Sequence, residues 1–370
     1  MIRCRRRGRC PDIVTTIDFD LGTIRGNRLT GRLVRVEVPG HGCGAPLGTP
    51  VEIEASEDDC VRWALRIGLI DEAGRYAAKF RLSQLAALSA HTLPDVRPGR
   101  ARWFIRLQAF IFTLDDALDN LGDIRVGADY MTHAELSPVL AAFQRALAGL
   151  PADPQLDARA ADFPRFSAFR AALADIRAEA QTEGGDLRWF VASMRDYFAA
   201  MAWEHSAHSD ADYHSTLSTY LCNREQTISY VQSLESFLLI KGVDLSPAQR
   251  ERHPVALLRI GACRHVILVN DIFSLAKELA CAELDNVLLL AARRDDSLRA
   301  RFTALLREVN ALAADIAHVA AALLAAYPDE PAISHYVETI VNSVNGHIDW
   351  YAHSRRYGAR VGELALRPAS

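Results

Sequence analysis

The first residues whose type and spacing suggest chemistry are three aspartates, Asp115, Asp116 and Asp119, set within apolar sequence. At 3.6 residues per turn, Asp115 and Asp119 project from one helix face about 40° apart, whereas Asp116 points about 100° away from Asp115. The preceding segment, residues 103–114, is apolar on nearly every side, which favours a buried helix over the ordinary alternative of a solvated acidic face. Buried carboxylates repel one another strongly, so a counter-cation is predicted, with Asp115 more important to it than Asp116.

A second row of oxygen ligands occurs later in the chain. Asn270, Ser274 and Glu278 are spaced i, i+4 and i+8, so on a helix they form a row about 12 Å long. Carboxylate, amide and hydroxyl oxygens without cysteine or histidine select a hard ion, Mg²⁺ or Mn²⁺, over zinc or copper. The two stretches together therefore predict a divalent-metal site.

In this order, the two stretches resemble the paired metal-binding motifs of class I terpene synthases of the bacterial type. The first motif is weakly specific, but the second is matched in full, with Asp271 and Lys277 at its remaining positions. The resemblance covers roughly residues 60 to 360. It implies a magnesium cofactor of three Mg²⁺ ions, for which Mn²⁺ can substitute, held by Asp115, Asp116, Asp119, Asn270, Ser274 and Glu278.

A further match concerns Arg224, which precedes Asn270 by 46 residues, where this family places its diphosphate-sensing arginine. The resemblance makes Thr227 the linker and Ile228 the effector of the helix that closes on the substrate. Here the chain departs from the family, in which the effector is often glycine and the linker is acidic in many members. Either departure bears on how Arg224 is coupled to closure, and neither removes a metal ligand.

Other side chains have both a functional and a structural interpretation. The resemblance assigns diphosphate contacts to Lys277, Arg356 and Tyr357, and cavity lining to Phe112 and Trp350. The alternatives are a solvated helix lysine for Lys277, a pin on the C-terminal helix for Arg356 and Tyr357, and ordinary core packing for Phe112.

The implied activity is that of a lyase that ionises an isoprenyl diphosphate and cyclises the resulting carbocation, with release of pyrophosphate. Farnesyl diphosphate is the favoured substrate and geranylgeranyl diphosphate the runner-up. A chain-elongating prenyltransferase and a non-enzymatic helical interaction protein are the alternatives of other classes. The residues expected to carry catalysis are Asp115, Arg224, Asn270, Ser274 and Glu278.

Composition places limits on the protein class. The chain has 370 residues, half of them hydrophobic, and a net charge of −4, so a soluble globular protein without a nucleic-acid partner is predicted. The longest apolar runs are shorter than the roughly 20 residues that span a bilayer, which predicts no membrane span. Seven cysteines form no C-x-x-C pair, and this favours a reducing, cytoplasmic setting. The oligomeric state is open between a monomer and a homodimer.

Residues 1–57 differ from the remainder in being Gly-rich and β-branched. They are predicted to form an irregular or partly disordered extension with at most a short hairpin, dispensable for the activity. Residues 58–370 are predicted to be one all-α domain, a class I terpenoid synthase bundle with the two metal motifs facing each other at one end. Helices are expected at about 167–183, 187–206, 215–240, 246–252, 254–281, 296–326 and 331–354.

Overall fold

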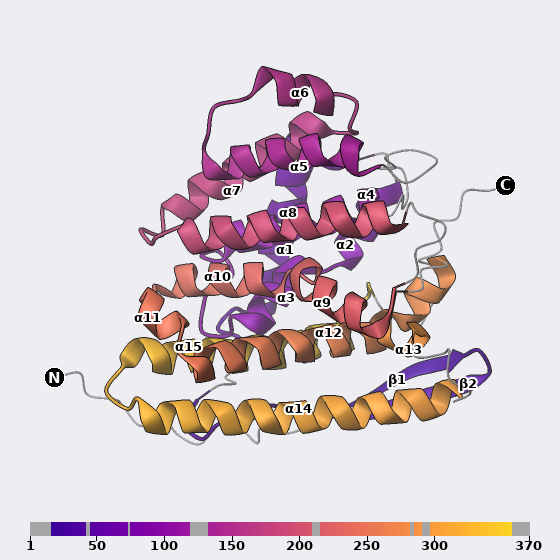
Figure 1. Cartoon of the computed structure of the whole chain (residues 1–370), viewed down its shortest axis with the longest axis vertical. Helices are drawn as coiled ribbons and strands as arrows, with labels where there is room; N and C mark the ends of the chain where they lie inside the picture. The colour runs from indigo at the N-terminus through magenta and orange to yellow at the C-terminus, as the bar shows by residue number, and fades with distance from the viewer. Residues whose placement is uncertain are drawn as a thin grey trace.

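The computed structural model describes residues 16–41, 45–72, 75–118, 132–208, 215–281, 285–290 and 297–356. Over these residues the protein is a bundle of helices with one two-stranded sheet, so the predicted all-α fold is confirmed (Figure 1). The helices are α1 (Pro50–Arg66), α2 (Arg75–Leu82), α3 (Leu85–Thr92), α4 (Arg102–Leu118), α5 (His133–Ala148), α6 (Pro154–Ala160), α7 (Phe166–Gln181), α8 (Arg188–His208), α9 (Leu217–Thr227), α10 (Tyr230–Lys241), α11 (Pro247–Arg250), α12 (His253–Cys281), α13 (Val287–Leu290), α14 (Leu298–Ala326) and α15 (Pro331–His353).

The first helix begins earlier than predicted, at Pro50 rather than residue 58. Thr49 and Glu52 form a capping box, in which each side chain accepts a hydrogen bond from the other residue's backbone N–H. Pro50 occupies the first helical position, where its missing N–H is not needed. The predicted boundary at residue 58 therefore lies in the middle of α1.

The N-terminal extension contains an ordered hairpin, β1 (Thr16–Ile24) and β2 (Asn27–Val34), paired antiparallel. In Figure 1 the hairpin lies alongside α14, and β2 and α14 are in contact. The Val34 N–H donates to Asn310 Oδ1 (2.9 Å), and the Val36 backbone exchanges two hydrogen bonds with the Asn345 amide. Arg35 forms a half-buried ion pair with Asp349. Residues 16–36 therefore pack on the helical core, which the sequence did not predict.

The predicted helix 215–240 is divided into two. α9 ends at Thr227 and α10 begins at Tyr230, because Ser229 adopts a left-handed conformation with φ 59°. Its backbone carbonyl accepts hydrogen bonds from both the N–H and the hydroxyl of Ser233. Such a conformation is uncommon for serine, and nothing in the local sequence signals it.

The helix that carries the first motif is buried as predicted. Nearly all residues of α4 are shielded from solvent, and its neighbours are α1, α3, α7 and α10. α12 contacts α9, α10, α14 and α15. The two motif helices are therefore central elements of the bundle, and their polar side chains emerge from packed faces.

One described helix, α14, is long and apolar enough to cross a membrane on the criteria of length and composition alone. A single such helix is weak evidence, since core helices of soluble proteins meet the same criteria. Here α14 contacts α12, α13, α15 and β2.

Candidate metal and diphosphate site

On the α4 side of the site, Asp116 is fully buried within a cluster of donors. It accepts hydrogen bonds from Tyr76 Oη (2.7 Å), Lys79 Nζ (2.6 Å) and Arg356 Nη2 (3.1 Å). Burial alone would raise the pKa of Asp116, but the positive charges of Arg356, Lys79 and Lys277 hold that pKa well below its usual range. Asp116 is thus a fully compensated carboxylate in this structure.

Asp115, one residue earlier, is half-buried, and its negative charge acts on Arg224. Asp119 lies outside the described residues. The predicted divergence of Asp115 and Asp116 is therefore visible as a difference in surroundings: Asp116 lies among cations from α2 and the C-terminal segment, and Asp115 faces the α9 side.

On the α12 side, Asn270, Ser274 and Glu278 are all buried. Asn270 Nδ2 donates to Tyr351 Oη (2.9 Å), and Asn286 Nδ2 donates to Glu278 Oε2 (2.7 Å). The buried Ser274 hydroxyl interacts with the Glu278 carboxyl beside it. Burial, and then the negative charge of Asp271, raises the pKa of Glu278 to about 8.

The second residue of this motif, Asp271, has a separate task. Its carboxylate accepts the Tyr220 hydroxyl (2.8 and 3.0 Å) and the Val287 backbone N–H (2.8 Å), so it joins α9 and α13 to α12. Burial raises the pKa of Asp271 to about 6. Asn286 Nδ2 adds a bond to the Asp271 backbone carbonyl (2.7 Å).

Arg224 connects α9 to the ligand row, since its Nη2 donates to Asn270 Oδ1 (3.0 Å). Burial alone would lower the pKa of Arg224, but Tyr220, Glu204 and Asp271 hold that pKa well above its usual range. Thr227 is buried at the last position of α9, and Ile228 caps the helix at the break before α10. The predicted sensor, linker and effector thus lie at a real discontinuity of the backbone.

The C-terminal segment brings Arg356 to the α4 side. Its guanidinium is buried, donates to Ser83 Oγ (3.1 Å) as well as to Asp116, and lies 4.6 Å from the centre of the Phe112 ring. Phe112 in turn stacks on Trp350 with ring centres 6.0 Å apart. Tyr357 lies outside the described residues.

Lys277 is half-buried on α12, and its charge acts both on Asp116 across the site and on Glu278 beside it. Together with the bond between Arg224 and Asn270, this places the two motifs at one end of the bundle. The structure therefore brings together the described residues predicted for the site: Phe112, Asp115, Asp116, Arg224, Thr227, Ile228, Asn270, Ser274, Lys277, Glu278, Trp350 and Arg356.

The α12 donor set fits a hard divalent cation. It offers an amide, a hydroxyl and a carboxylate oxygen, and burial opposes the ionisation of that carboxylate. A cation placed there would favour the charged form of Glu278. Among the described residues, no three or more His, Cys, Asp or Glu side chains gather closely enough to hold a metal ion by themselves.

Several residues that build the site were not assigned their present roles from sequence. Tyr76 and Lys79 hold Asp116, Tyr351 and Asn286 hold the ligand row, and Tyr220 holds Asp271. Each lies far from its partner in the chain or outside the motif. Only Asn286, eight residues after Glu278, was near enough to be suspected from spacing.

A helical bundle whose two oxygen-ligand stretches face each other, with arginines from two further segments, is the arrangement of a class I terpene synthase. The sequence model for terpene synthase family 2, C-terminal metal binding, matches residues 106–311, more than half of the chain. This protein belongs to that family. It is a terpene synthase, an enzyme that acts on isoprenyl diphosphates, and the matched region is the metal-binding domain.

Relatives with assigned activities agree with this placement. The chain is 26% identical over 317 residues to pristinol synthase from Streptomyces pristinaespiralis, covering 82% of this chain and 80% of that enzyme. It is 26% identical to the farnesyl-diphosphate-cyclizing (−)-β-caryophyllene synthase from Saccharothrix espanaensis, covering 86% and 89%. The fold matches that of 2-methylisoborneol synthase from Streptomyces coelicolor, solved with Mg²⁺ and 2-fluoroneryl diphosphate, with a TM-score of 0.69, 19% identity and coverage of 86% and 96%.

Proposed function

We propose that the protein is a Mg²⁺-dependent sesquiterpene cyclase that ionises farnesyl diphosphate and cyclises the carbocation. The observation that carries the proposal is the buried row Asn270, Ser274 and Glu278 with Arg224 bonded to its first member. The named activity of the caryophyllene synthase supports farnesyl diphosphate as the substrate.

The proposed metal ligands are Asn270, Ser274 and Glu278 on α12 and Asp115 on α4, together with Asp119, which lies outside the described residues. Bound magnesium supplies Lewis-acid stabilisation of charge on the diphosphate leaving group. Asn270 Oδ1 already accepts a hydrogen bond from Arg224. A metal ion bound to the row would compete with Arg224 for Asn270, and a bound diphosphate would compete with Asn270 for Arg224. Binding of substrate therefore requires Arg224 to turn from Asn270 toward the diphosphate, which suits a sensor.

The cations near Asp116 are proposed to hold the diphosphate from the opposite side. Arg356 and Lys277 lie close to Asp116, and Arg356 carries a flat array of donors suited to phosphate oxygens. Asp116 compensates these charges in the absence of substrate. Its full burial favours this role over that of a direct metal ligand, because its two oxygens already accept from Lys79, Arg356 and Tyr76.

Below the proposed metal site, Phe112 and Trp350 present stacked rings. Phe112 already carries the Arg356 guanidinium over its face, and aromatic faces attract cations. Such faces stabilise a carbocation without offering it a nucleophile. We propose that these rings line the upper part of the cavity in which cyclisation occurs.

The deciding experiment is incubation of the purified protein and MgCl₂ with geranyl, farnesyl and geranylgeranyl diphosphate separately, followed by gas chromatography with mass detection. A cyclic hydrocarbon or alcohol is expected from farnesyl diphosphate. The isosteric variant Glu278→Gln, which lacks the carboxylate of one proposed metal ligand, serves as the matched control. Removal of the metal with EDTA should abolish the product. Cyclic products from geranylgeranyl diphosphate alone would transfer the assignment to a diterpene cyclase. A longer prenyl diphosphate, formed when isopentenyl diphosphate is added, would identify a chain-elongating transferase instead.

A further inference from the structure

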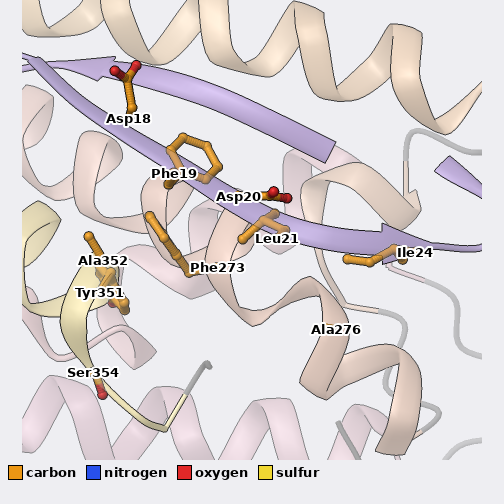
Figure 2. A pocket seen from close by; sticks show the side chains of 10 residues that line it. All are labelled: Asp18, Phe19, Asp20, Leu21, Ile24, Phe273, Ala276, Tyr351, Ala352 and Ser354. Atoms are coloured by element: carbon orange, nitrogen blue, oxygen red, sulfur yellow. The ribbon is translucent and has the colours of Figure 1, made fainter. Parts of the chain in front are cut away.

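The N-terminal hairpin reaches the metal-binding helix through one aromatic side chain. Phe19 on β1 packs against Phe273 on α12 with ring centres 5.0 Å apart, and against Phe302 on α14 at 6.2 Å. In Figure 2 Phe19 lies on the strand near Phe273, and Tyr351 at the end of α15 lies on the other side of Phe273. Phe273 is the residue immediately before the proposed ligand Ser274.

The aromatic contacts continue to the ligand row. Phe273 stacks on Tyr351 with ring centres 5.7 Å apart and planes 9° from parallel. The Tyr351 hydroxyl accepts the hydrogen bond from Asn270 Nδ2. Three contacts in sequence therefore join a side chain of the extension to the amide of a proposed metal ligand: Phe19 to Phe273, Phe273 to Tyr351, and Tyr351 to Asn270.

The hairpin is built to place Phe19 there. Phe19 pairs across the sheet with Gly31, and a Cβ atom on Gly31 would come within 2.7 Å of both the Phe19 ring and Leu306 of α14. Glycine thus leaves the room that the phenyl ring occupies. The hydrogen bonds that the Val34 and Val36 N–H groups donate to Asn310 and Asn345, and the ion pair between Arg35 and Asp349, fix the segment that follows.

Packing beside the stack is incomplete. A pocket of about 280 Å³ lies between β1 and the helices α12 and α15, lined by Phe19, Phe273, Tyr351 and Ala276 among others. Because space is open on this side, the stack lacks the close support that a filled core would give it. The Phe19 ring is one of the groups that limit movement of Phe273 and Tyr351.

We propose that the hairpin is a positioning element of the metal site, in which Phe19 acts through Phe273 and Tyr351 to orient the Asn270 amide. The Tyr351 hydroxyl fixes the amide so that Oδ1, rather than Nδ2, faces the ligand side. This inference rests on the proposed role of Asn270 as a metal ligand. Partners that orient a ligand typically account for 10-fold to 100-fold in metal affinity.

The test measures the rise in melting temperature caused by a fixed concentration of pyrophosphate as MgCl₂ is varied. Phe19→Leu keeps apolar volume but removes the ring, and Tyr351→Phe keeps the ring but removes the hydroxyl. Both variants are expected to raise the half-maximal MgCl₂ concentration about 10-fold. The double variant should do little more than either alone, because both act through Asn270.

The matched control is Leu33→Ala, a fully buried hairpin residue outside the aromatic stack. It is expected to lower the melting temperature without magnesium or pyrophosphate at least as much as Phe19→Leu does, yet to leave the half-maximal MgCl₂ concentration unchanged. Equal MgCl₂ requirements in Phe19→Leu, Leu33→Ala and the wild type would overturn the positioning role. Absence of any magnesium-dependent rise in the wild type would instead refute the proposed function, so the two failures are distinguishable.

Discussion

The two sides of the site differ in how their charges are balanced. On the α4 side, Asp116 is surrounded by Lys79, Arg356 and the Tyr76 hydroxyl, so its carboxylate is fully compensated and the cluster carries more positive than negative charge. On the α12 side, burial and the negative charge of Asp271 raise the pKa of Glu278 to about 8, so the ionised carboxylate is poorly compensated there.

This difference teaches that the two motifs serve different parts of the substrate complex. An incomplete oxygen row is suited to receive a cation, whereas a saturated aspartate is suited to hold cations ready for an anion. A bound metal ion would complete the α12 side, and a diphosphate that arrives with it would compete with Asp116 for the cations of the α4 side.

The largest expected effect comes from the incomplete side. Asn270→Ala, Ser274→Ala and Glu278→Gln should each lower turnover by about 100-fold or more, because charge developing on the leaving group loses its compensation. Circular dichroism should show an unchanged helical fold. Near-wild-type turnover in all three variants at saturating MgCl₂ would show that the row holds no catalytic metal.

Loss of Asp116 on the α4 side should lower the stability of the protein. Asp116→Ala leaves Lys79 and Arg356 buried without their counter-ion, so a loss of about 3–5 kcal/mol in the free energy of unfolding is expected. Asp115→Ala, on the adjacent half-buried residue, should change that free energy by less than about 1 kcal/mol while reducing turnover. Urea denaturation measures both. Equal stability losses in the two variants would contradict the contrast between the sides.

The dependence of stability on pH should reveal a third, smaller effect, which comes from a buried histidine of α12. Burial lowers the pKa of His265 to about 3, and neither ring nitrogen has a hydrogen-bond partner among the described residues. The unfolded chain therefore binds a proton at His265 below about pH 6.5, whereas the folded chain does not until about pH 3. This residue alone costs about 1.4 kcal/mol of stability per pH unit as pH falls through that window.

His265→Leu should reduce the acid-induced loss of unfolding free energy by about 1.4 kcal/mol per pH unit between pH 6 and pH 4.5. Urea denaturation measures this loss, and a substitution of the exposed His253, His253→Gln, serves as the control. The raised pKa of Glu278 acts in the opposite direction, and the difference between variant and wild type removes its contribution. An identical pH dependence in His265→Leu and the wild type would show that the buried histidine is not neutral in the folded protein.

Much of the site could be predicted from sequence because the helix repeat alone determines its spacing. Asn270, Ser274 and Glu278 share a face wherever the helix lies, and the apolar run before Asp115 requires that α4 be buried. The partners of Asp116 could not be predicted, since Lys79 and Arg356 are 37 and 240 residues away and only the tertiary fold brings them together.

Two features of the fold were missed for related reasons. The division between α9 and α10 depends on a left-handed Ser229, a conformation that serine rarely adopts and that no glycine or proline marks. A short hairpin was allowed within the predicted extension but its docking was not, because the contacts that stabilise the two-stranded ribbon are supplied by α14 and α15.

Those hairpin contacts also constrain the order in which the protein forms during synthesis. Hydrogen bonds and ion pairs from Val34, Arg35 and Val36 join residues separated by 276, 314 and 309 positions in the chain. They cannot exist until the ribosome has produced almost the whole polypeptide, since domains otherwise fold as their segments emerge. The first described residues of the chain are thus among the last to dock.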